Sequence, residues 1–149
     1  MIPAAVPNAV GAPNRQPHRD TYPDQAPRAV LSVLLTDGTP WLERVDFDPI
    51  HRWTEQVAAT AEHQVWLQTW LPGQASDLHD HRQHQGAFIV LRGTLSEFVI
   101  TPTLGHERHI WRPGVIRSYG AGHVHRLGND HGPTAISLHV LAIPMALSH

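Results

Sequence analysis

The sequence has no cysteine, few charged residues and no long hydrophobic run, and each absence removes a class of function. Because none of the 149 residues is cysteine, a disulfide framework, a thiolate metal site and a cysteine nucleophile are excluded. Charged residues make up only 16% of the chain and the formal net charge is -2, so nothing predicts a nucleic-acid partner or an anionic membrane partner. No apolar run approaches the roughly 18 residues of a membrane span. Since the first residues also lack the pattern of a secretory signal peptide, we expect a cytoplasmic protein.

The first 27 residues contain six prolines and almost no large apolar side chains. Such a segment buries too little surface to offset the entropy of ordering it. We therefore expect a disordered, proline-rich tail over residues 1–27 and one domain over residues 28–149. The apolar run at residues 29–35 predicts one or two helical turns. Asp48-Pro49 has the residue types of a helix N-cap and first position, which predicts a second helix through Arg52 and Trp53 towards Ala61.

From His63 onward the hydrophobic period changes to two residues, which is typical of strands. Short alternating runs follow one another, separated by turn signals such as Pro72-Gly73 and Arg92-Gly93. Seven or eight short strands at this spacing predict an all-β sandwich or barrel. The predicted strands cover residues 63–70, 78–81, 87–91, 95–101, 108–111, 116–119, 124–127 and 135–143.

Histidine is unusually frequent, with 13 in the chain. Residues two apart in a strand point to the same face, so His79 and His81 can present two imidazoles to one divalent metal ion. Such a pair alone is a weak signal, because surface or hydrogen-bonded histidines show it too. His123 stands two residues before His125 and can face the same interior. By default we expect the histidines in turns and at strand ends to face solvent: His84, His106, His109, His123 and His131.

Two sets of residues in this order resemble the two motifs of the cupin superfamily. The first set is Gly73, His79, His81, Gly86 and Gly93, and the second is Gly114, Gly120, Gly122, His125 and Asn129. The resemblance implies a small cupin β-barrel (a double-stranded β-helix, or jelly roll) with one or two short N-terminal helices, and the metal ligands His79, His81 and His125. Gly86 stands where the first motif has a glutamate ligand, which implies a site of three histidines.

Residues 70–93, then His125 to Asn129 and Ser137 to His139, look like the bacterial cysteine dioxygenase family, and the resemblance covers about residues 52–144. It implies an Fe(2+)-dependent enzyme that adds both atoms of dioxygen to the thiol of a small thiol carboxylate, such as cysteine or 3-mercaptopropionate, giving a sulfinic acid. It also implies that Arg52 binds the substrate carboxylate and that Ser137 and His139 belong to a catalytic relay. In the family this relay ends in a tyrosine, but the matching residue here is Leu141.

The chemistry of the ligands fits this resemblance. Three imidazoles accept iron, copper, nickel or zinc, and three neutral ligands leave the metal its full charge, which deprotonates a coordinated thiol. Trp70 and Phe88 are candidates to line the pocket, and Tyr119 or Tyr22 could supply the missing hydroxyl.

Several alternatives remain open. Arg52 can be a surface arginine on a helix, and Ser137 and His139 can be a hydrogen-bonded pair in the core. The missing tyrosine favours a metal-dependent cupin oxygenase or isomerase with a non-thiol substrate. A non-catalytic cupin that binds a small ligand is the third possibility. We expect a monomer or a homodimer.

Overall fold

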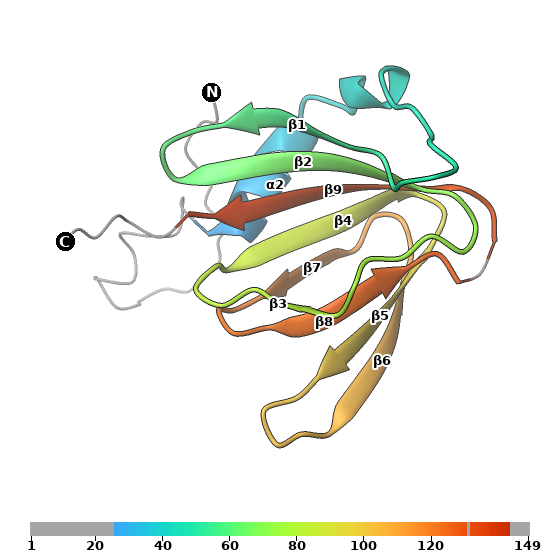
Figure 1. The fold of residues 1–149 in the computed structure, drawn as a ribbon. Coiled ribbons are helices and arrows are strands. Elements are labelled where there is room, and N and C mark those ends of the chain that lie inside the picture. The colour runs from blue at the N-terminus through green and yellow to red at the C-terminus, as the bar shows by residue number, and fades with distance from the viewer. Residues whose placement is uncertain (1–25, 131, 144–149) are drawn as a thin grey trace.

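Strands dominate the computed structural model, which describes residues 26–130 and 132–143 (Figure 1). The all-β class expected from the sequence is therefore confirmed. Helix α2 spans Pro27–Leu35 and a single 3-10 turn, η2, spans Pro40–Glu43. The strands are β1 (Thr54–Ala59), β2 (His63–Trp70), β3 (His79–Asp80), β4 (Gly86–Arg92), β5 (Leu95–Ile100), β6 (His106–Trp111), β7 (Ile116–Tyr119), β8 (Val124–Gly128) and β9 (Ala135–Ala142).

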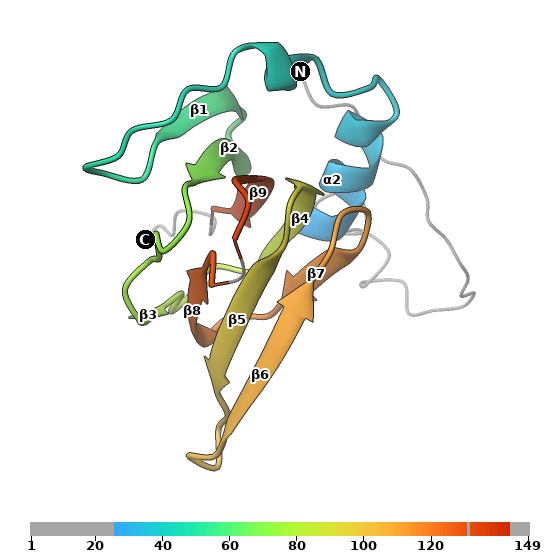
Figure 2. The same cartoon turned by 90° about the vertical axis from the view of Figure 1, so that its right-hand side faces the viewer.

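The strands form two antiparallel sheets that face each other. One sheet has the order β1-β2-β9-β4-β7 and the other β3-β8-β5-β6. In Figure 2, α2 lies on one side of β4 and β9, and strands β3 and β8 lie on the other. One buried apolar cluster fills part of the space between the sheets: Trp70, Phe88, Val90, Leu95, Leu127 and Ala135.

Helix α2 covers the outer face of the five-stranded sheet. Its Val30 and Leu31 are buried against alternate residues of the sheet, including Leu67, Ile89 and Leu138. The opposite faces of these strands are then left for the space between the sheets, because side chains alternate along a strand. On β9 this inner face carries Ser137 and His139, which are also buried.

The helix predicted from Asp48 towards Ala61 is wrong. Asp48 does accept hydrogen bonds from the backbone N–H groups of Ile50 and His51, at 2.8 and 3.2 Å, but the turn ends there. The chain then enters β1, which pairs antiparallel with β2 from Thr54 opposite Gln68 onward. The capping signal is therefore satisfied by one turn, while pairing with β2 decides the conformation of the residues that follow.

Two other expectations concern the N-terminal tail and the possibility of a membrane span. Residues 1–25 of the predicted tail, and His131, lie outside the described residues. None of the helices within residues 26–130 and 132–143 combines the length and hydrophobicity needed to cross a membrane.

Candidate metal centre

Three imidazoles from two paired strands and the loop beside them converge on one point. His79 lies on β3 directly opposite His125 on β8, and His81 follows β3. The Nε2 atom of His81 is 3.1 Å from Nε2 of His79 and 2.9 Å from Nε2 of His125. The structure thus brings together the three residues that the family resemblance implies as metal ligands. Their nitrogen atoms form a group that could hold a metal ion.

The spacing of these nitrogens fits a shared metal ion. Two nitrogens bound at about 2.1 Å and at right angles to each other lie about 3.0 Å apart, close to the two measured separations. The other ring nitrogens of two of the histidines are held by acceptors: Nδ1 of His79 donates to the backbone oxygen of Asp77 at 2.8 Å, and Nδ1 of His125 donates to Glu97 at 2.7 Å. Each bond leaves Nε2 with a free lone pair, as metal ligation requires.

Burial disfavours the charged form of two of these imidazoles, those of His81 and His125. Burial, together with the neighbouring His125 and His79, lowers the pKa of His81 to about 3. Burial also lowers the pKa of His125, although the hydrogen bond and charge of Glu97 act in the opposite direction. Neutral imidazole is the form that binds metal, so these two residues need little proton release when the site is loaded.

Glu97 is the buried anion behind the site, and the sequence reasoning missed it. Its side chain is fully buried on β5 and accepts four hydrogen bonds: from His125, His123, Trp111 and Arg117, at 2.7, 2.9, 2.9 and 2.8 Å. Burial alone would raise the pKa of this carboxyl group, but the four donors and the positive charge of Arg117 lower it well below its ordinary value.

A readable signal for Glu97 was present in the sequence. It stands between Leu95 and Val99 on one face of a strand, and a carboxylate on a buried face requires partners. His123 also departs from the expectation that it faces solvent, because it is half-buried and hydrogen-bonded to Glu97. His84 is half-buried too, with Nδ1 donating to the backbone oxygen of Ala142 at 2.9 Å.

Tyr119 on β7 packs against the ligand histidines. Its ring centroid is 4.7 Å from that of His81 and 5.3 Å from that of His125, and its ring stacks on His123 at 4.6 Å. Burial and the charge of Glu97 raise the pKa of Tyr119 above its ordinary value, so the phenol stays protonated.

Arg52 lies just before β1 with its guanidinium group 4.5 Å above the ring of Trp70. Its Nε atom is buried and has no hydrogen-bond partner within the part of the chain that the structure describes. Burial lowers the pKa of Arg52, and the nearby Asp77 carboxylate offsets part of this effect. A buried, unpaired donor on a cation suits an anionic ligand, since such a group costs free energy until it is paired.

Ser137 and His139 share the inner face of β9. Trp70 Nε1 donates to Ser137 Oγ at 2.9 Å, and Ser137 Oγ lies 2.7 Å from His139 Nε2. The His139 ring stacks on Phe88 at 5.2 Å. Burial, followed by the fields of His125 and Arg52, lowers the pKa of His139 to about 3. His139 is therefore a neutral imidazole within electrostatic reach of both the three histidines and Arg52.

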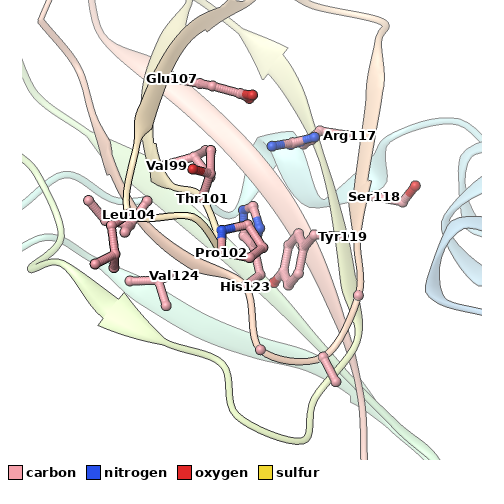
Figure 3. Close-up of a pocket in the computed structure, with 14 residues that line it drawn as sticks. Val99, Thr101, Pro102, Leu104, Glu107, Arg117, Ser118, Tyr119, His123 and Val124 are labelled. Carbon is pink, nitrogen blue, oxygen red and sulfur yellow. The ribbon is translucent and has the colours of Figure 1, made fainter.

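A cavity of about 560 Å³ lies on the far side of Tyr119 and His123. Figure 3 shows these two rings close together, with Arg117 beside them and Glu107 on the other side of the cavity. Neither His79, His81 nor His125 lines the cavity. Tyr119 and His123 contact the ligand histidines and also line the cavity, so they form the wall between the two spaces.

Comparison with known proteins gives one family and one fold. A family model described as cysteine dioxygenase type I matches residues 24–149. No curated protein sequence matches this chain. The structure is similar to that of the TT1209 protein from Thermus thermophilus, with a TM-score of 0.60 and 26% identity over 68% of this chain and 92% of that one.

Two further solved structures share the architecture. An uncharacterized conserved protein with a double-stranded β-helix domain from Klebsiella pneumoniae has a TM-score of 0.59 and 22% identity, over 67% of this chain and 84% of that one. A cupin superfamily protein from Desulfitobacterium hafniense has a TM-score of 0.60 and 11% identity, over 70% and 89%. These similarities confirm the cupin double-stranded β-helix.

Proposed function

Because this chain belongs to the cysteine dioxygenase type I family, we propose that it is an iron-dependent dioxygenase that oxidises the thiol of a small thiol carboxylate to a sulfinic acid. Substrates of the cysteine or 3-mercaptopropionate type have the required groups. The observation that carries the proposal is the pairing of a three-imidazole cluster with a buried, unpaired arginine donor. One arrangement suits a metal ion and the other suits a carboxylate.

The overall reaction balances without another reductant. The thiol R–SH and O2 give R–SO2H, in which both oxygen atoms are bonded to sulfur and the carbon–sulfur bond is intact. Sulfur loses four electrons and dioxygen gains four. The thiol proton remains with the product, which ionises to the sulfinate.

His79, His81 and His125 would hold the metal through Nε2. Bound ferrous iron would lower the pKa of the substrate thiol and supply the redox chemistry that dioxygen requires. Zinc accepts the same ligands but has no redox chemistry. The protein's own contribution is to orient the ligand rings, and the hydrogen bonds of His79 to Asp77 and of His125 to Glu97 do this for two of the three.

Arg52 would bind the substrate carboxylate. Its guanidinium group lies over the ring of Trp70, and a planar fork of N–H donors matches a carboxylate in two parallel hydrogen bonds. The substrate carboxylate would also satisfy the Nε donor that lacks a partner. His139, whose pKa is lowered by burial and then by the charges of His125 and Arg52, would lie beside the chain of atoms that joins carboxylate to thiol. Ser137 and Trp70 fix the orientation of its ring.

A second candidate function follows from Leu141. In the family the relay that begins with Ser137 and His139 ends in a tyrosine, and Leu141 has no hydroxyl. The alternative is a metal-dependent cupin oxygenase or isomerase that acts on a carboxylate without a thiol.

The test is anaerobic reconstitution with ferrous iron, followed by oxygen uptake with a panel of small molecules. Cysteine and 3-mercaptopropionate carry both groups, cysteamine lacks the carboxylate, and 3-hydroxypropionate lacks the thiol. We expect one O2 consumed per thiol carboxylate and incorporation of two labelled oxygen atoms into the product. Activity on 3-hydroxypropionate alone would support the second candidate, and no uptake with either thiol carboxylate would refute the first.

Arg52→Gln gives a matched control for substrate binding. Loss of a charge-assisted pair costs about 1.5–3 kcal/mol, or roughly 10- to 150-fold in KM. The KM of the thiol carboxylates should rise by this factor, and the KM of cysteamine should not change. An equal effect on all three thiols would show that Arg52 supports the fold rather than the carboxylate.

A further inference from the structure

The Tyr119 ring is fixed by its neighbours, while its hydroxyl group has no hydrogen-bond partner among residues 26–130 and 132–143. The ring stacks on His123 at an interplanar angle of 17°, and His123 is itself held by a 2.9 Å hydrogen bond to Glu97. Packing against His81 fixes another face of the ring. Within the described residues, no hydrogen bond to the Tyr119 hydroxyl is found. A phenol that is held in place but unpaired has a donor available for a ligand.

Gly86 provides the room for this hydroxyl group. A Cβ atom at position 86 would overlap with the hydroxyl oxygen and Cζ of Tyr119, and would stand 2.8 Å from its Cε1 atom. Gly86 lies directly opposite Tyr119 on β7 and directly opposite Leu141 on β9. The Tyr119 hydroxyl therefore occupies the space into which a side chain at position 86 would extend.

That space faces the interior of the barrel. Residues two apart on a strand share a face, so position 86 faces the same side of β4 as Phe88, whose ring stacks on His139 at 5.2 Å. The hydroxyl group thus lies on the inner side of β4, the side that also carries Phe88 with the stacked ring of His139. The ring that carries the hydroxyl is 4.7 Å from the ring of His81 and 5.3 Å from that of His125, centroid to centroid.

We propose that Tyr119 is a catalytic residue whose phenol donates a hydrogen bond to dioxygen during the oxidation of the substrate sulfur. This inference rests on the proposed function. The ordinary pKa of tyrosine is about 10, so the phenol is a donor at neutral pH. The bond strengthens as negative charge develops on oxygen, which lowers the barrier. No proton needs to leave Tyr119, and the stoichiometry of the reaction is unchanged.

Tyr119→Phe removes only the oxygen atom and keeps the ring that packs on His81 and His123. We expect an unchanged iron content and melting temperature, a nearly unchanged KM, and a kcat lower by about 10²- to 10³-fold. Ser118→Ala is the matched control, because it removes the exposed hydroxyl group of the preceding residue on β7, and its kcat should equal that of the wild type. A fall in iron content or melting temperature with Tyr119→Phe would mean that the hydroxyl supports the fold, and would overturn the proposal.

Nitric oxide provides a second measurement that does not depend on turnover. It is a diatomic stand-in for dioxygen, and its binding to the anaerobic, iron-loaded protein is followed by electron paramagnetic resonance. Loss of one hydrogen bond should weaken nitric oxide binding to Tyr119→Phe by about 5-fold, with a changed spectrum. Equal binding and equal kcat in the wild type and this variant would overturn the role of Tyr119 while leaving the proposed function intact.

Failure of the proposed function can also be distinguished from failure of the role assigned to Tyr119. If the wild type oxidises no thiol but Tyr119→Phe binds nitric oxide more weakly, the proposed function is wrong and the hydrogen bond to a diatomic ligand is supported. Gly86→Ala tests the geometry, because the added methyl group must displace the Tyr119 hydroxyl. We expect it to reproduce the nitric oxide effect, with no further change in the double variant Gly86→Ala/Tyr119→Phe. Additive effects would overturn the assignment of Gly86.

Discussion

Glutamine at position 97 keeps the shape of the buried side chain and changes its charge and one of its acceptors. Oε1 of Glu97 accepts hydrogen bonds from Trp111 and Arg117, and Oε2 accepts from His123 and His125. If the NH2 group of Glu97→Gln faces Trp111 and Arg117, which can only donate, two hydrogen bonds are lost and two donors are left buried without partners. If it faces His123 and His125, these bonds survive only when each ring moves its proton to the other nitrogen, and in His125 this removes the Nε2 lone pair that a metal ion needs. In either orientation, the Arg117 cation loses its buried anionic partner.

The expected cost follows from these contacts. A buried donor without a partner costs about 1–3 kcal/mol, and removing one partner of a buried ion pair costs about 3–5 kcal/mol. These figures overlap, because Arg117 is one of the four donors. We expect Glu97→Gln to lower the free energy of unfolding by about 4 kcal/mol, and the melting temperature by about 10 °C. Metal affinity should fall by about 10- to 100-fold, because His125 loses the acceptor that orients it.

The assay uses urea unfolding of the metal-free protein at pH 7 and chelator competition for the metal. Glu107→Gln is the matched control: Glu107 is exposed and bonds to His109 at 3.1 Å, so its replacement should change stability by less than about 0.5 kcal/mol. If Glu97→Gln matched the wild type in both stability and metal affinity, the four hydrogen bonds would not hold the site.

Acid adds an independent check on Glu97. Its folded-state pKa lies well below the unfolded value, so the carboxylate contributes stability at neutral pH. That contribution is lost as the pH falls below about 4, where the unfolded chain takes up the proton first. Glu97→Gln should lack this part of the acid transition, and an unchanged transition would contradict the assigned pKa direction.

Three further predictions concern other residues of the site. His81→Ala should abolish iron retention after desalting, measured by mass spectrometry of the metal, while replacement of the exposed His106 should not. The free energy of unfolding of the metal-free protein should be highest above pH 6.5 and should fall as the pH decreases towards 3, because the pKa of His139 in the folded protein is about 3. For this buried group the loss is at most about 4–5 kcal/mol. In urea unfolding, the free energy of unfolding of His139→Gln should therefore change less with pH than that of the wild type. In the Tyr119→Phe background, Leu141→Tyr should restore part of the lost oxygen uptake, since both positions flank Gly86; a folded double variant with no gain would contradict this placement.

The strands and the histidine cluster could be predicted because their signals are local. Burial alternates residue by residue along most of β2, and this is the pattern that the sequence displays. The pair His79 and His81 needs only the period of a strand to share a face. Adding His125 required the order of the motifs, since 44 residues separate it from His81.

The helix predicted from Asp48 could not have been corrected locally. Asp48-Pro49 is a real turn signal, and the structure uses it for one turn. What the sequence does not display is that residues 54–59 are an edge strand, which among the described strands pairs only with β2. None of the residues of β1 is fully buried. The sequence of this strand therefore shows only a weak alternation of hydrophobic and polar residues. Pairing with a strand further along the chain then outweighs the local preference.

The position of Tyr119 is the clearest case of information that only the fold provides. The family resemblance puts the hydroxyl group two residues beyond His139, where Leu141 stands, and the sequence offers Tyr119 and Tyr22 as replacements without placing either. The registers of β4 place Gly86 between Leu141 on one neighbouring strand and Tyr119 on the other. A residue without a side chain leaves a space that either neighbour can fill, so a hydroxyl group can reach the same part of the barrel from β7 or from β9 without a change in the backbone. Loss of a tyrosine at position 141 is therefore not evidence that the site lacks a phenol, because the strand on the other side of Gly86 supplies one.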